Sequence, residues 1–190
     1  MSKTALLLID FQNDYFEGGK WYLEGAEAAA KQAAKLLAAY REQSLPVIHV
    51  RHEFPSKDAP FFLAGSEGAR HHSSLAPMDG EPVVLKNYVN AFRNTKLKET
   101  LDQNSVTSVM ITGAMSHMCV DAVTRAANDF GYQCVVVHDA CATSDLEFNG
   151  TSVPASQVHA SVMAALGFAY AKVASTDELM ADLNLTHASE

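Results

Sequence analysis

Six short apolar segments that alternate with helical segments constrain the fold of this chain more than any other feature. The first runs from Ala5 to Ile9 without a polar residue and stops at Asp10, which is typical of a strand buried on both faces of a parallel sheet. Strands are predicted at residues 5–9, 46–50, 82–85, 107–112, 133–137 and 169–173, and helices at 26–43, 95–103, 120–130, 154–166 and 175–183. This alternation predicts an α/β fold, a parallel sheet covered by helices on both faces with right-handed crossovers.

Several helix ends carry their own signals. Gly131 can supply the left-handed residue that ends the helix before it, and Gly167 is predicted to end the helix that starts at 154. The segment Ser175-Thr-Asp-Glu178 has the pattern of a capping box and opens the last helix.

Two long segments show no sustained period. Residues 51–80 are interrupted by prolines and glycines but contain Phe54, Phe61 and Phe62, so we predict a folded lid rather than a flexible linker. Residues 139–153 are predicted to form a second long loop. With 190 residues, 48% of them hydrophobic, the chain is long enough for one buried core, and we predict a single domain over residues 1–190.

Charge and cysteine content exclude several classes of protein. The net charge of -8 and the pI of about 5.4 argue against binding to nucleic acid or to an anionic membrane surface, which both need clustered Lys and Arg. The three cysteines form no metal-type pairing and fit a reducing compartment better than a disulfide scaffold. The N-terminal apolar run is too short for a signal peptide or a membrane span, so we predict a cytoplasmic protein.

The segment around Cys119 carries the first chemical signal. An apolar run halts at Gly113, and a helix of small residues restarts after Ser116, which we predict to be its N-cap. A thiol at the start of a helix is expected to have a pKa below its ordinary value of ~8.5, since the helix dipole favours the thiolate. A buried structural role is the alternative, because cysteine is among the most buried residue types.

Three predicted strands deliver reactive side chains to the same edge of the sheet. Asp10 follows the first strand, Lys86 the third and Cys119 the fourth, and parallel sheets place their sites beyond the carboxyl ends of the strands. Together they can hydrolyse an acyl bond: Cys119 attacks, Asp10 takes the thiol proton and returns it to a leaving amine, and Lys86 stabilises both anions. Backbone N–H groups of the turn before Cys119 are suited to an oxyanion hole.

Four ordered motifs resemble the isochorismatase-like family of cysteine hydrolases, which includes nicotinamidases, N-carbamoylsarcosine amidohydrolase and ureidoacrylate hydrolases. The motifs are Leu7-Leu-Ile-Asp-Phe-Gln-Asn-Asp14, Val84-Leu-Lys-Asn-Tyr-Val-Asn-Ala-Phe92, Thr112-Gly-Ala-Met-Ser-His-Met-Cys-Val120 and Val137-His-Asp-Ala140. The resemblance implies a three-layer α/β/α fold with a doubly wound six-stranded parallel sheet ordered 3-2-1-4-5-6, and an assembly into homo-dimers or homo-tetramers.

The resemblance also implies site residues: a catalytic triad of Asp10, Lys86 and Cys119, a cis peptide bond between Ala114 and Met115, and an oxyanion hole made by the N–H groups of Met115 and Cys119. Isochorismatases proper cleave a vinyl ether and lack the cysteine, so Cys119 favours hydrolysis of a C–N amide-type bond of a small molecule through a thioester. The alternatives are an isochorismatase-type, lactam or ureido hydrolase of the same family, or a family member with a mainly binding role.

No cofactor and no metal are predicted. Nicotinamidases carry an Asp-x-His metal motif after the second strand, where this chain has Arg51-His-Glu-Phe-Pro55. The adjacent His71 and His72 lack the spacing of known metal sites and are predicted to be solvated. A nucleotide- or flavin-binding module is a further alternative, but Gly18-Gly19 does not form the phosphate-binding pattern that such a module needs.

Candidate substrate-binding residues flank the predicted triad. Tyr15 and Phe16 follow Asp10 and can stack on a planar substrate, although packing of the loop explains them equally well. His117, two residues before the nucleophile, is the candidate specificity residue, with a helix-capping role as its alternative. His159 is expected to be a packing or interface residue, and Glu147 and Phe148 are expected to border the site.

Overall fold

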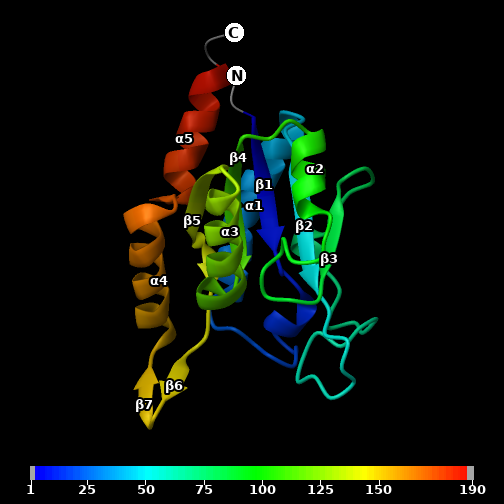
Figure 1. The fold of residues 1–190 in the computed structure, drawn as a ribbon, viewed down its shortest axis with the longest axis vertical. Coiled ribbons are helices and arrows are strands. Elements are labelled where there is room, and N and C mark those ends of the chain that lie inside the picture. The colour runs from blue at the N-terminus through cyan, green and yellow to red at the C-terminus, as the bar shows by residue number, and fades with distance from the viewer. Residues whose placement is uncertain (1–2, 188–190) are drawn as a thin grey trace.

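Six parallel strands form the central sheet. The computed structural model describes residues 3–187, with side chains up to residue 181. The strands are β1 (Thr4–Ile9), β2 (Val47–His52), β3 (Val83–Lys86), β4 (Ser108–Ala114), β5 (Gln133–Ala142) and β8 (Lys172–Ala174), and they lie in the order β3-β2-β1-β4-β5-β8 (Figure 1). This order confirms the predicted three-layer, doubly wound fold, in which β8 is the sixth strand of the sheet.

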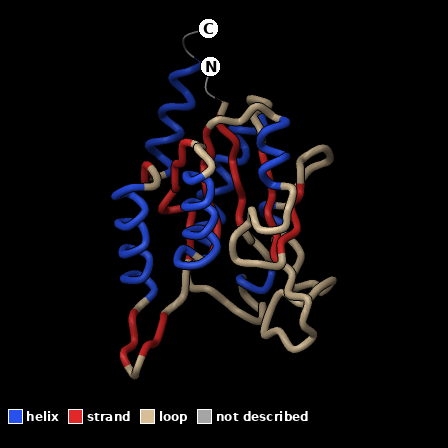
Figure 2. Tube along the Cα trace, in the orientation of Figure 1, coloured by secondary structure: helices blue, strands red, loops and turns tan. Residues whose placement is uncertain are grey.

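Helices cover both faces of the sheet. Side chains of α1 (Ala26–Glu42) and α5 (Thr176–His187) pack on one face, and side chains of α2 (Leu97–Gln103), α3 (Asp121–Asp129) and α4 (Ala155–Ala169) pack on the other. Short helical turns lie at η1 (Asn13–Tyr15), η2 (Ser73–Leu75) and η3 (Ser116–Val120). Figure 2 shows that long loops gather at the end of the molecule toward which β1 runs in Figure 1. Within residues 3–187, no helix is long and apolar enough to cross a membrane.

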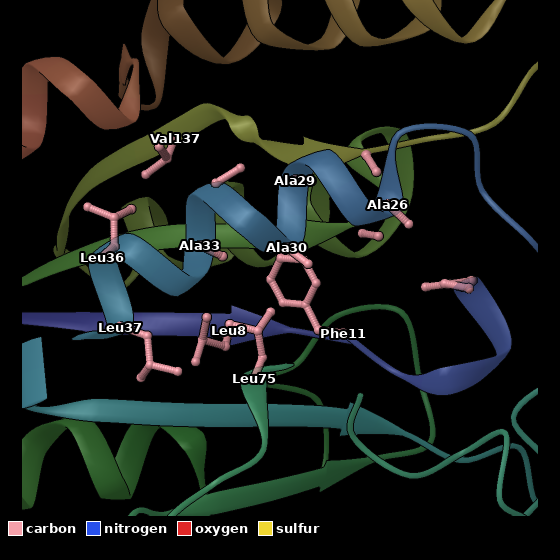
Figure 3. Packing of buried hydrophobic residues seen from close by; sticks show 14 of the residues in the cluster. Leu8, Phe11, Ala26, Ala29, Ala30, Ala33, Leu36, Leu37, Leu75 and Val137 are labelled. Carbon is pink, nitrogen blue, oxygen red and sulfur yellow. The ribbon is translucent and has the colours of Figure 1, made fainter. Parts of the chain in front are cut away.

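The first strand shows why the sheet needs cover on both sides. Leu6 and Leu8 pack with α1 in one apolar cluster, whereas Leu7 and Ile9 belong to the cluster beneath α2, α3 and α4. Figure 3 shows Leu8 and Phe11 under the alanine-rich face of α1. Because alternate side chains of a strand point to opposite faces, a run without polar residues can be buried only between two layers.

Three sequence predictions of loops and ends were wrong. β5 continues to Ala142, and a small antiparallel hairpin of β6 (Leu146–Phe148) and β7 (Thr151–Val153) follows it, so residues 139–153 are not one long loop. α4 continues through Gly167 to Ala169, and β8 begins only at Lys172. Gly167 packs close to Val173, and it keeps a helical conformation there instead of turning into the left-handed region.

The segment after β2 is folded against the domain. Phe61 and Phe62 are buried and contact the ring of Tyr15, with centroid distances of 5.7 and 4.6 Å. The backbone N–H of Phe62 donates to the buried carboxylate of Asp14 at 2.6 Å. These contacts fasten the segment over the carboxyl edge of the sheet, near the end of β1.

Candidate active site

Four polar side chains converge at the carboxyl edge of the sheet, each from a different element. Asp10 directly follows β1, His52 ends β2, Lys86 ends β3, and Cys119 lies in η3 just after β4. His52 and Lys86 are paired across neighbouring strands. All four are at least 95% buried, which is unusual for ionisable side chains that have no chemical task.

The Lys86 ammonium lies at the centre of this cluster. Its Nζ is 2.8 Å from Oδ2 of Asp10, 2.8 Å from Nδ1 of His52 and 3.2 Å from Sγ of Cys119. Both carboxylate oxygens of Asp10 are buried, and Oδ1 is the one outside the ion pair with Lys86. A carboxylate oxygen of Asp10 and the Cys119 sulfur lie within 4.8 Å of each other. The structure thus brings together the three residues predicted as a triad.

The electrostatics of the thiol differ from the prediction. Burial and the adjacent Asp10 carboxylate raise the pKa of Cys119 to about 12, although Lys86 acts in the opposite direction. The expected lowering by a helix start was wrong, because loss of water around the sulfur is the largest influence on this pKa and raises it. Burial lowers the pKa of Lys86, but Asp10 and Cys119 outweigh it and hold this pKa above its ordinary value. Both shifts favour a neutral thiol beside an ammonium at neutral pH.

His52 is the member of the cluster that the sequence analysis did not single out. Burial and the Lys86 charge lower its pKa to about 4, so the ring is neutral, and its Nδ1 accepts the hydrogen bond from Lys86. Gln12 fixes the His52 backbone: its Oε1 accepts from the His52 N–H and its Nε2 donates to the His52 carbonyl, both at 2.7 Å. Gln12 lies in the first quoted motif, and this position was the signal available in the sequence.

The turn before Cys119 is built by a close approach of two strands. Gly113 has a φ of +136°, and a Cβ at this position would collide with the backbone oxygen of Ile9. The next peptide bond, between Ala114 and Met115, is cis. Met115 precedes the π-helical turn η3, in which Cys119 is the fourth residue. The N–H groups of Met115 and Cys119 thus belong to one compact turn.

Ser116 does not cap this helix as predicted. Its hydroxyl lies 3.3 Å from the carbonyl of Ala142, to which it donates, and 2.8 Å from Nδ1 of His159. Because Ser116 bonds to β5 and α4 instead of to the helix N-terminus, it ties η3 to its neighbours. His159 is a packing residue in this contact, as expected.

The three predicted substrate-binding residues differ in their surroundings. Tyr15 is buried, and burial followed by the charges of Cys119 and Asp10 raises its pKa well above the ordinary value. Nδ1 of His117 lies 2.6 Å from the hydroxyl of Thr143.

The ring of Phe16 already stacks on His72, with a centroid distance of 3.8 Å, so it packs the loop instead of offering this face to a substrate. His71 and His72 are half-buried and not fully solvated as predicted: His71 packs against His49, and His72 lies between Phe16 and Ser74. Phe148 is 76% exposed on the β6–β7 hairpin.

The cluster does not suit a metal ion. Ligand atoms of Asp10, His52 and Cys119 lie within 4.8 Å of one another, a spacing compatible with coordination. The Lys86 ammonium, however, contacts all three, and a fixed positive charge at the centre of the donor set repels a cation. Arg51, in the segment where nicotinamidases carry their metal motif, pairs with Glu53 at 2.8 Å. A metal-free site therefore stays our prediction, with Lys86 as its physical reason.

Comparison with known proteins identifies the family. The isochorismatase domain family matches residues 4–167. An isochorismatase family protein of Bacillus subtilis, YddQ, is 45% identical over 93% of this chain and 98% of its own length. A maleamate amidohydrolase of Pseudomonas putida is 33% identical over 72% of this chain and 71% of its own length. Among solved structures, an isochorismatase hydrolase from Oleispira antarctica has 63% sequence identity to this chain. The match covers 95% of this chain and 97% of the Oleispira chain, and the two superpose with a TM-score of 0.92. On these matches, the chain belongs to the isochorismatase-like family of hydrolases.

Proposed function

We propose that the chain hydrolyses a C–N amide-type bond of a small molecule through a thioester on Cys119. The observation that carries this proposal is the contact of one buried ammonium, that of Lys86, with both the Asp10 carboxylate and the Cys119 sulfur. The ammonium stabilises the carboxylate at rest. It also stabilises the thiolate that forms as the thiol proton moves to the carboxylate. A cysteine with a purely structural role needs neither a carboxylate nor an ammonium beside its sulfur.

The proposed reaction has two halves. In the first, Asp10 accepts the thiol proton as Sγ of Cys119 bonds to the amide carbon; the C–N bond then breaks, and Asp10 gives the proton to the leaving nitrogen. In the second, Asp10 takes a proton from water, whose oxygen attacks the thioester carbon, and the sulfur leaves with that proton. A carboxylic acid and an amine or ammonia are released, and the site returns to its starting protonation state.

The neutral resting thiol determines when the proton moves. Because burial and Asp10 hold the pKa of Cys119 at about 12, a free thiolate is rare at neutral pH, and proton transfer must accompany attack. Oδ1 of Asp10, which is buried and does not form the ion pair with Lys86, is the oxygen we assign to this transfer. Lys86 holds the carboxylate in place, and His52 positions Lys86.

The tetrahedral intermediate needs donors for its oxyanion. We propose the backbone N–H groups of Met115 and Cys119, which belong to the turn that leads from β4 into η3. Relatives support the bond type: the maleamate amidohydrolase of Pseudomonas putida and nicotinamidase 3 of Arabidopsis thaliana are amide hydrolases by name. We propose Tyr15 and His117 as further substrate contacts, on the strength of their places beside Asp10 and Cys119.

Replacing Cys119 by alanine tests the function. Amine release should be measured from a panel of primary amides, ureido acids and lactams, with circular dichroism as the check on folding. We expect Cys119→Ala to abolish turnover and keep the fold. Cys134→Ala is the matched control, because Cys134 is equally buried but lies outside the cluster, and it should retain turnover. A Cys119→Ala chain that still hydrolyses the substrate overturns the proposal.

We also propose that residues 1–190 act as a single domain in a homo-dimer or homo-tetramer. Both apolar clusters flank the same sheet, which supports one domain. Phe168 of α4 is 91% exposed, and we propose that a partner subunit covers it. Sedimentation analysis tests the assembly, and a monomer at micromolar concentration would contradict it.

A further inference from the structure

Ser116 joins neighbouring elements at the start of the turn that carries Cys119. Its carbonyl accepts from the N–H of Asp121 and so opens η3. Its hydroxyl is fully buried and donates to the carbonyl of Ala142 at 3.3 Å, and Ala142 pairs with Ala114 at the end of β4. The Ser116 side chain thus ties η3 to β5 at the point where the turn leaves the sheet.

His159 of α4 holds the same hydroxyl from the other side. Its Nδ1 lies 2.8 Å from the Ser116 oxygen. Burial, followed by the charge of His138, lowers the pKa of His159, so the ring is neutral at pH 7 and carries one proton. A hydroxyl also has one proton to give, and that of Ser116 goes to Ala142. Both contacts are hydrogen bonds at the same time only when Nδ1 of His159 carries the ring proton and donates to Ser116.

This chain of hydrogen bonds reaches the two backbone groups proposed as the oxyanion hole. Met115 directly precedes Ser116, and the Met115 carbonyl accepts from the N–H groups of Met118 and Val120 at 3.0 and 3.3 Å. Met115 and Cys119 therefore belong to one hydrogen-bonded turn, in which Ser116 supplies the anchoring side chain. A shift of this turn along β5 would move both N–H groups away from the oxyanion, and the bonds of Ser116 oppose such a shift.

We propose that His159 and Ser116 are positioning residues, which hold the N–H groups of Met115 and Cys119 where the oxyanion of the tetrahedral intermediate develops. This inference rests on the proposed acyl transfer to Cys119 and adds to it a chain of hydrogen bonds that starts on α4. Its effect is confined to reactions that place negative charge on an oxygen, because an oxyanion hole stabilises that charge and not the attack of sulfur as such.

Two reagents that react with the same sulfur separate positioning from general damage to the fold. With p-nitrophenyl acetate, the sulfur bonds to the acetyl carbon through an oxyanion, the thiol proton moves to Asp10, and p-nitrophenolate leaves. With iodoacetamide, the sulfur bonds to carbon as iodide leaves, the thiol proton passes to solvent, and no oxyanion forms. The rates of acylation and alkylation of Cys119 are measured in the full chain by peptide mapping, with circular dichroism as the check on folding.

We expect His159→Leu and Ser116→Ala to slow acylation about 10-fold, less than the roughly 100- to 1,000-fold cost of removing an oxyanion donor outright, and to change alkylation less than about 2-fold. His159→Asn should restore acylation to within about 3-fold of wild type, because an amide N–H can donate to Ser116 in place of Nδ1–H. Val162→Ala is the matched control. Val162 also lies on α4 and packs against the apolar cluster beneath it, and its loss should change neither rate.

The outcomes separate this inference from the proposed function. Equal slowing of acylation and alkylation in His159→Leu shows a merely structural role and overturns the proposal, as does unchanged acylation or a failure of His159→Asn to restore it. A wild-type Cys119 that is alkylated but never acylated also overturns it, since no oxyanion is then stabilised. If acylation depends on His159 and Ser116 but no amide is hydrolysed, the positioning role stands and the proposed amide hydrolysis fails.

Discussion

Replacing Lys86 by methionine is the most severe test of charge balance in the buried cluster. Methionine has a similar length and no charge, so the substitution removes the ammonium that lies 2.8 Å from Asp10 without opening a large cavity. Both side chains of this ion pair are fully buried. Removing one partner of a buried pair leaves the other charge uncompensated, which costs about 3–5 kcal/mol.

The magnitude is large on the scale of the whole domain. A domain of this kind has a free energy of unfolding of about 5–15 kcal/mol, so Lys86→Met should still fold but with a much lower urea midpoint. Lys98→Met is the matched control. The Lys98 ammonium also lies 2.7 Å from a carboxylate, that of Asp102, but this pair is about half exposed and should contribute less than about 1 kcal/mol.

A double-mutant cycle identifies the cause. Asp10→Asn removes the opposing charge, so Asp10→Asn combined with Lys86→Met should be considerably more stable than the sum of the two single losses predicts, with a coupling energy of about 2 kcal/mol. The assay is urea unfolding followed by circular dichroism at pH 7. A loss below about 1 kcal/mol in Lys86→Met, or simple additivity in the double variant, would refute the reasoning that an unpaired buried charge is responsible.

Three further predictions concern the frame around the site. Gly113→Ala should lower the free energy of unfolding by about 2 kcal/mol or more, because the φ of +136° and the adjacent β1 backbone leave no room for a Cβ; thermal unfolding measures it, and an unchanged midpoint contradicts it. Burial opposes ionisation of Glu81, but the hydrogen bonds from Arg41, from the backbone of Met78 and from His49 together outweigh it and lower the pKa to about 2. Ionised Glu81 therefore stabilises the fold above the ordinary carboxyl pKa of ~4.3, and this stabilisation is lost as the pH falls toward 2. The free energies of unfolding of wild type and Glu81→Gln should converge at that pH. A constant difference between them down to pH 2 would count against the prediction. Ser175→Ala should cost about 1 kcal/mol by breaking the reciprocal capping bonds with Glu178, which urea unfolding can resolve, and a cost near zero would show that the box does not stabilise α5.

The sheet was predictable because its signal is local. The run from Ala5 to Ile9 has no polar residue, and such a strand requires a layer on each face. The same strands fix where Asp10 and Lys86 emerge, so their approach to Cys119 followed from topology. The capping box at Ser175 also formed as predicted, since its two partners are three residues apart.

Other features depend on contacts between distant segments. The pKa of Cys119 is set by its burial beneath several elements and by Asp10, more than one hundred residues away, so the local helix signal gave the wrong direction. His52 became part of the cluster because β2 extends to pair with the end of β3, beyond the predicted strand. Gly167 stayed helical because α4 continues against β8, which the sequence around a single glycine does not reveal.

The central claim is that the Cys119 sulfur carries the acyl group during turnover. Mass spectrometry of the intact protein, quenched during hydrolysis of an active amide, should show an adduct with the mass of the acyl group, and peptide mapping should place it on Cys119. The adduct should disappear on treatment with hydroxylamine, which cleaves thioesters, and should be absent from Cys119→Ala. An adduct on another residue, or full turnover by Cys119→Ala, would contradict the account.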